Sequence, residues 1–126
     1  MLSTPQAATG IEIQPKLHEA ALAARRAFEA IDGASLRAER VALECGDAFA
    51  EDAAWPDTAD VVFCTTTCFT PELRAALERG VARMHAGARL IVTTQPFESP
   101  RLTLLRRGGL PYGKGSLQFF TYTVGK

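Results

Sequence analysis

The sequence predicts an α/β fold built around a mostly parallel sheet. Short apolar runs alternate with segments of helical periodicity as far as Thr94, which is the pattern of successive βα units. Residues 61–64 are apolar without polar alternation, as expected for a strand buried on both faces of a parallel sheet. Hydroxyl residues follow at 65–67, and Thr70 then provides an N-cap for a helix that starts with proline and glutamate. Open α/β sheets bind ligands at such a strand, elbow and helix start, although any βα junction shares the pattern.

The chain has 126 residues, of which 47% are hydrophobic, and a formal net charge of zero. This length is enough for one domain with a core, and the composition excludes a disordered chain. The overall charge gives no argument for nucleic acid, but the basic residues are unevenly placed. Five of them follow Glu98 without any acid: Arg101, Arg106, Arg107, Lys114 and Lys126. A basic end of the chain can bind a polyanion, or it can form a surface strand whose charges are solvated. The solvated strand is the simpler interpretation.

The first predicted elements are a strand at 10–13 and a helix that starts at Pro15. The helix places apolar residues on one face at spacings of three and four, and Gly33 is its expected stop. The residues of this face are Leu17, Ala21, Ala24, Phe28 and Ile31.

The remaining elements continue the alternation. A second strand is expected at 40–45, a loop or short helical piece at 50–58, and the third strand at 61–64. The helix after it carries Leu73, Leu77, Val81 and Met84 on one face and ends near Gly87, which is expected in the left-handed conformation. A fourth strand is expected at 89–94, and strands at 102–106 and 117–124 predict an antiparallel hairpin at the sheet edge.

The glycine-rich segment 108–116 nearly matches the sequence pattern of a phosphate-binding loop. Gly108 and Gly113-Lys114 have the required spacing, but Gly115 stands where serine or threonine is needed. A phosphate loop must also open a helix, whereas strand-forming residues follow here. We therefore expect a hairpin connection.

The cysteines and the N-terminus favour an intracellular protein. Cys45, Cys64 and Cys68 are odd in number and form no C-x-x-C pair, which favours reduced, buried thiols and gives no zinc-site spacing. Residues 1–9 are small and polar, so neither a signal peptide nor a membrane span is expected, and no membrane partner.

Polar residues end three successive predicted strands. Glu12 is placed to accept both hydroxyls of a ribose, and Asp47 to accept the amino group of an adenine. Thr65 follows the third strand. Each residue alone is equally explained as a cap or turn residue, but together they would line one edge of the sheet.

Several segments, taken in order, resemble the class I S-adenosylmethionine-dependent methyltransferases. In detail they are most similar to the Dot-one-like, non-SET histone lysine methyltransferases, over residues 10–124. The segments are Gly10-Ile11-Glu12-Ile13, Cys45-Gly46-Asp47, Val62-Phe63-Cys64-Thr65-Thr66-Thr67-Cys68-Phe69-Thr70-Pro71-Glu72 and Gly87-Ala88-Arg89-Leu90-Ile91-Val92-Thr93-Thr94-Gln95-Pro96-Phe97.

The resemblance implies S-adenosylmethionine as cofactor and assigns roles by position. Glu12 matches the acid that holds the cofactor ribose, and Asp47 the residue that meets the adenine amino group. Ala48 stands where an aromatic ring that stacks on adenine is expected. Thr65 replaces an asparagine near the methyl donor, and Phe69 matches an aromatic that lines the lysine channel.

The resemblance also implies an incomplete Rossmann-like sheet, mostly parallel with a C-terminal antiparallel hairpin. The family's first strand and glycine-rich cofactor loop would precede Gly10, where only nine residues stand. We therefore expect a flexible segment at 1–9, a partial methyltransferase domain at 10–126, and weak cofactor binding.

Two functions follow from these expectations. The first is methyl transfer to a protein lysine, with a histone in the nucleosome as the implied substrate. The second is a non-catalytic interaction or scaffold module. A glycine-rich loop encoded upstream would favour the first, and initiation at Met1 the second. The histone interpretation implies a nuclear protein and the alternative a cytoplasmic one; direct DNA binding and the oligomeric state are left open.

Overall fold

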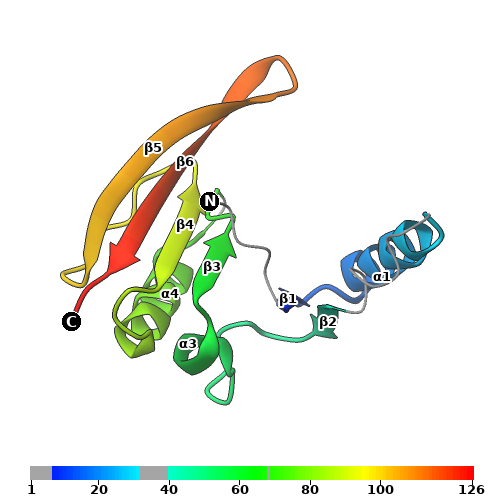
Figure 1. The fold of residues 1–126 in the computed structure, drawn as a ribbon, viewed down its shortest axis with the longest axis horizontal. Helices are drawn as coiled ribbons and strands as arrows, with labels where there is room; N and C mark the ends of the chain where they lie inside the picture. Colours follow the sequence, from blue (N-terminus) through cyan, green and yellow to red (C-terminus); the bar gives the residue numbers. More distant parts are fainter. Residues whose placement is uncertain (1–6, 32–39, 68) are drawn as a thin grey trace. The chain divides into compact units, whose positions relative to one another are not determined.

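The chain folds into two compact units, Met1–Ala50 and Glu51–Lys126, and each is described by itself. The computed structural model describes residues 7–31, 40–67 and 69–126 (Figure 1). The first unit contains strand β1 (Ala8–Glu12), helix α1 (Pro15–Glu29) and strand β2 (Val41–Cys45). The two strands are parallel neighbours, paired from Ala8 opposite Val41 to Glu12 opposite Cys45. This βαβ arrangement is the one expected from the sequence, and β1 begins two residues earlier than predicted.

Helix α1 starts at Pro15, as predicted, because proline fits the first helical position. The apolar face is less covered than the periodicity suggested, since α1 contains no buried residue and Leu17 is 51% exposed. The predicted stop at Gly33 lies outside the described residues. Within the stretches that the structure describes, no helix is long and apolar enough to cross a membrane.

The second unit is a four-stranded sheet with two helices. In chain order it contains α3 (Trp55–Thr58), β3 (Val61–Cys64), α4 (Pro71–Arg83), β4 (Arg89–Thr93), β5 (Leu102–Tyr112) and β6 (Gly115–Val124). The strand order is β3-β4-β6-β5, with β3 and β4 parallel and the other pairs antiparallel. The expected antiparallel hairpin at the sheet edge is confirmed (Figure 1).

Helix α4 forms as the sequence predicts. The Thr70 hydroxyl accepts a hydrogen bond from the Leu73 amide at 3.2 Å, which satisfies one of the free N–H groups of the first turn. Most of the buried apolar side chains come from α4 with its C-cap residue and from one face of β4 and β6, so the core forms between this helix and the sheet. They are Leu77, Val81, Met84, Leu90, Val92, Phe120, Tyr122 and Val124.

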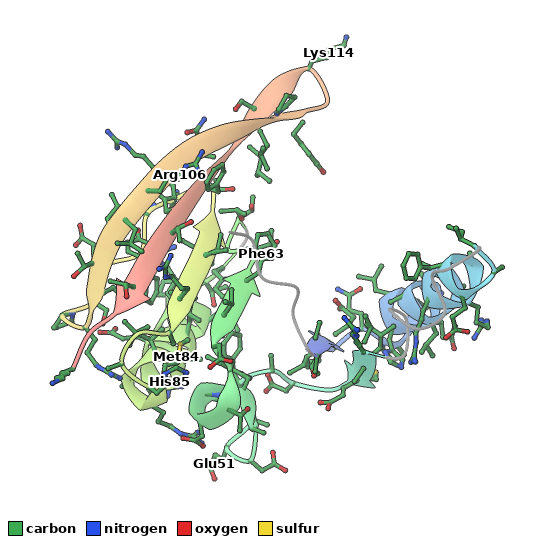
Figure 2. The ribbon with its side chains drawn as sticks, viewed as in Figure 1. Glu51, Phe63, Met84, His85, Arg106 and Lys114 are labelled. Atoms are coloured by element: carbon green, nitrogen blue, oxygen red, sulfur yellow. The ribbon has the colours of Figure 1, made fainter. Side chains whose placement is uncertain are left out.

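Strand β3 corrects the expectation of burial on both faces. Val61 is 59% and Phe63 63% exposed, whereas Val62 and Cys64 are half-buried. In the described part of the chain, β3 pairs with β4 alone and β1 with β2 alone, so each lies at an edge of its own sheet. Figure 2 shows the Phe63 side chain on β3. Val61 and Phe63 lie on the same face of β3, so this face is uncovered, because side chains on a sheet face are buried by elements that pack on that face.

The hairpin is longer than predicted, because most of the glycine-rich segment belongs to strands. Strands β5 and β6 are joined by Gly113 and Lys114 alone, and Gly113 has a φ of +58°. A two-residue turn needs positive φ at its first position when it follows the type II′ geometry, and glycine adopts it without strain. A phosphate loop is therefore excluded at this place.

His85, just beyond α4, predicts a pH dependence of stability. Its Nδ1 lies 3.1 Å from the Ala86 carbonyl oxygen and its Nε2 2.9 Å from Asp60 Oδ1. These two contacts raise its pKa above the ordinary 6.5. A raised folded-state pKa stabilises the protein below the unfolded value, and this contribution is lost as pH rises through the folded value.

We therefore expect the free energy of unfolding to fall between about pH 6 and pH 8, the range in which histidine titrates. Urea unfolding followed by the fluorescence of Trp55, the single tryptophan, measures it. In His85→Gln this fall should disappear; an equal fall in both proteins would show that another group titrates.

Candidate functional site

The carboxyl ends of β1 and β2 bring two acids to neighbouring positions. Glu12 is the last residue of β1, paired with Cys45, and its carbonyl oxygen accepts the Gly46 amide at 2.9 Å. Asp47 follows directly. Glu12 and Asp47 share one edge of the first unit's sheet, as predicted, because parallel strands end at the same edge. The predicted edge with all three residues is not formed by one sheet, because Thr65 follows β3 in the other sheet.

Each acid uses one oxygen to fix its own turn. Glu12 Oε1 accepts the Gln14 amide at 3.0 Å, and Asp47 Oδ1 accepts the Phe49 amide at 2.9 Å. No side chain or amide in the described ranges is recorded on the second oxygen of either group. The turn-cap interpretation is therefore correct for both residues, and it leaves acceptor capacity for a ligand's N–H or O–H groups.

These residues fit the polar ends of an adenosine group. Carboxylates at adjacent strand ends can accept ribose hydroxyls and an amino group. Ala48 and Phe49 are both half-buried. Ala48 offers no ring for stacking, so Phe49 is the aromatic residue nearest to the position where one is expected.

The second unit ends β3 in a threonine elbow, which we define as residues 65–67. Thr65 is exposed directly after the strand, and Phe69 is half-buried. The Phe69 amide donates to the Thr66 carbonyl at 3.1 Å. Thr65 and Phe69, the two residues predicted for the methyl-transfer site, therefore flank one short turn.

The elbow is held by the end of β4. Thr66 is 4% exposed, and its hydroxyl donates to the Thr93 carbonyl at 2.7 Å. The Thr67 and Thr94 hydroxyl oxygens lie 2.7 Å apart. These two contacts fix the elbow against the next strand, so the position of Thr65 is set by its neighbours.

Thr94 has an unusual backbone. Its φ is +73°, which is rare for a β-branched residue. The Gln95 amide donates to the Thr93 carbonyl at 2.8 Å, which closes a γ-turn around Thr94. Strained residues of this kind cluster at functional sites, and this one lies at the carboxyl end of a parallel strand.

Thr66, Thr67, Thr93 and Thr94 were not predicted as parts of the candidate site. The available signal was the recurrence of threonines directly after two apolar runs, at 65–67 and 93–94. Also not predicted was a shallow hollow of about 260 Å³ beside β5, lined by Pro96, Phe97, Glu98, Ser99, Leu102, Leu104 and Tyr122.

Cys64 contributes no nucleophile to the elbow. Cys64 precedes the elbow, and burial raises its pKa to about 11, so its thiol stays protonated at neutral pH. Cys45 is exposed rather than buried as expected, and Cys68 lies outside the described residues. Residues 7–31, 40–67 and 69–126 contain no group of three side chains able to hold a metal ion.

Comparison with known proteins shows the fold. No protein-family model matches the chain, and no curated protein matches its sequence. Among solved structures, the candidate methyltransferase yhhF from Escherichia coli matches with a TM-score of 0.67 and 15% identity, over 96% of this chain and 66% of its own. The magnesium protoporphyrin IX methyltransferase ChlM from Synechocystis PCC 6803, solved with bound SAM, matches with a TM-score of 0.67 and 14% identity, over 94% and 60%.

A third structure, the mitomycin 7-O-methyltransferase MmcR, matches with a TM-score of 0.63 and 17% identity, over 94% of this chain and 42% of its own. The chain thus spans less than two thirds of the length of each of these three proteins. The histone methyltransferase family is not among these structures. The chain has the Rossmann-like α/β fold of class I S-adenosylmethionine-dependent methyltransferases.

Proposed function

We propose that the chain forms part of an S-adenosylmethionine-dependent methyltransferase. The observation that carries the proposal is the pair of carboxylates, Glu12 and Asp47, at the ends of adjacent parallel strands. The shared fold supports it, as does the SAM that one structural neighbour binds.

In this proposal Glu12 accepts the ribose hydroxyls and Asp47 accepts the adenine amino group. Their turn hydrogen bonds orient them beforehand, which lowers the entropy lost on binding. Ala48 lies beside the adenine, and Phe49 supplies the apolar contact that alanine cannot give. When bound, the cofactor supplies an activated methyl group on its sulfonium.

We further propose a protein lysine as the methyl acceptor, with a histone as the substrate that the sequence resemblance implies. Phe69 would form an apolar wall for the lysine side chain, and an apolar wall favours the neutral amine because desolvation disfavours charge. Thr65 would offer its exposed hydroxyl to the amine. The structural neighbours include methyltransferases for a porphyrin, for mitomycin and for tRNA, so the fold leaves the acceptor class open.

Tritium transfer from labelled S-adenosylmethionine tests the proposal. Core histones, nucleosomes and bulk tRNA are offered as acceptors, and acid hydrolysis identifies methyl-lysine. Glu12→Ala removes hydrogen bonds to a charged group, worth about 1.5–3 kcal/mol, so at low cofactor the rate should fall at least tenfold. Glu19→Ala is the matched control, because Glu19 is an exposed acid on α1.

Equal rates in the two variants would remove Glu12 from the site. If the tritium label appeared in RNA and not in lysine, the proposed acceptor would be RNA instead of protein. The proposal that the chain is part of a methyltransferase would stand.

A non-catalytic interaction module is the second candidate. It is favoured by Val61 and Phe63, which are large, apolar and exposed on an edge strand, because such strands are sites of pairing with other chains. It predicts no binding of S-adenosylhomocysteine at any concentration.

A further inference from the structure

The β5–β6 hairpin extends beyond the sheet as a two-stranded arm. Strand β4 pairs with β6 only from Phe119 to Thr123, so residues 108–118, which we call the ribbon, have no third strand beside them. The four residues of β6 before Phe119 extend the ribbon by about 14 Å at ~3.4 Å per residue. Figure 1 shows the hairpin projecting past β4.

The ribbon and its root carry positive charge alone. Arg106 and Arg107 lie at the root, Lys114 lies in the turn, and all three are exposed. No acid occurs after Glu98. No ion pair of these three residues is recorded within the described ranges, and Figure 2 shows Lys114 extending from the tip.

Arg101, the neighbouring basic residue, is occupied elsewhere. Its guanidinium donates to the carbonyl oxygens of Val81, Ala82 and Gly125. Within the β5–β6 hairpin, the positive charge available to a partner is therefore that of the root and tip.

The charges point to opposite sides of the ribbon. Arg106 is paired with Thr121 and Arg107 with Phe120, and successive residues of a strand face opposite ways. A ribbon lying flat on a surface would use one face only. A ribbon inserted into a groove meets negative charge on both sides.

Two large exposed side chains, a tyrosine and a leucine, lie near the tip of the ribbon. Tyr112 is 73% and Leu110 56% exposed, on the same face as Arg106 by the strand alternation. An exposed tyrosine next to a lysine can contact base edges or a thymine methyl group at a groove floor.

We propose that the ribbon binds duplex DNA by entering its major groove, an activity that goes beyond the proposed methyl transfer. The groove of B-DNA is about 12 Å wide and admits a two-stranded β-ribbon, so the ribbon can lie along it with both its root and its tip beside the walls. Arg106, Arg107 and Lys114 meet phosphates of the groove walls, and Tyr112 reaches the base edges. The deep, narrow major groove of duplex RNA does not admit such a ribbon.

Fluorescence anisotropy with labelled duplex DNA of about 20 base pairs, or roughly two helical turns, tests this on the full chain without cofactor. Three phosphate contacts predict that affinity falls about 40-fold between 50 and 200 mM salt. The triple variant Arg106→Gln, Arg107→Gln, Lys114→Gln should lose most binding and this salt dependence.

The matched control is Lys16→Gln, Arg26→Gln, Arg79→Gln, which removes the same charge from exposed positions of α1 and α4. It should keep the affinity and salt slope of the original chain. Lys114→Glu, in the exposed turn, should weaken binding without touching the core; circular dichroism checks that each variant folds.

Four results would overturn the proposal: no salt-dependent binding at 50 mM salt, equal losses in the ribbon and control variants, equal or tighter binding to single-stranded DNA or duplex RNA of the same length, or full binding by Lys114→Glu. Because the assay contains no cofactor, its outcome is independent of whether the chain transfers methyl groups.

Discussion

Replacement of Arg101 by alanine is expected to lower the free energy of unfolding of the second unit by about 3 kcal/mol, since hydrogen bonds to charged groups contribute roughly 1.5–3 kcal/mol each. Arg101 Nη1 donates to the carbonyls of Val81 at 3.0 Å and Ala82 at 2.7 Å, and Nε donates to Gly125 at 3.0 Å. The cation thus caps the last turn of α4, where the helix dipole favours positive charge. It also holds the chain end beside β5.

Urea unfolding monitored by Trp55 fluorescence measures the loss. Arg101→Lys should fall between the original chain and alanine, because an ammonium group lacks the planar fork that reaches several carbonyls. Arg106→Ala is the control and should stay within about 0.5 kcal/mol, as exposed substitutions usually do. Equal midpoints for Arg101→Ala and Arg106→Ala would show that the contacts contribute nothing.

Replacement of Gly80 by alanine is expected to destabilise the same unit by about 1–3 kcal/mol, the usual cost of overpacking a core. Alanine is ordinarily better than glycine inside a helix by roughly 1 kcal/mol, so propensity alone predicts the opposite sign. Gly80 is buried in α4 against the Trp55 ring. A Cβ atom there would lie 2.6 Å from Trp55 Cζ2 and closer still to Cη2.

Circular dichroism during urea unfolding gives the sign for Gly80→Ala. The double variant Gly80→Ala, Trp55→Leu separates the clash from other effects: relative to Trp55→Leu alone, the alanine should then stabilise the helix. A more stable Gly80→Ala single variant would contradict the close packing of Trp55 on α4.

Local patterns predicted most of the elements. Thr70, Pro71 and the spacing of Leu77, Val81 and Met84 define α4 by capping and periodicity, and both depend on residues close in sequence. The end of β2 was equally well predicted, because Gly46-Asp47 directly follows an apolar run, whereas β1 ends at Glu12, one residue before its predicted end.

Contacts between residues that are far apart in the chain were not predicted from the sequence. The Thr67–Thr94 and Thr66–Thr93 contacts join residues far apart in the chain, and no local pattern signals them. Burial of β3 was wrongly predicted because the apolar run reveals the strand but not its neighbours. The hairpin was predicted too short, since glycine and proline at 108–111 suggested a loop where edge strands tolerate both.

The amides of Gln14 and Phe49 provide the most direct test of the account, because they donate to the carboxylates of Glu12 and Asp47. Titration of ¹⁵N-labelled protein with S-adenosylhomocysteine should shift both amide resonances, with a dissociation constant weaker than about 10 μM. In Glu12→Ala the shifts should be strongly reduced, and in Glu19→Ala they should persist. Absence of shifts at saturating ligand, or unchanged shifts in Glu12→Ala, would contradict the claim that this edge binds the cofactor.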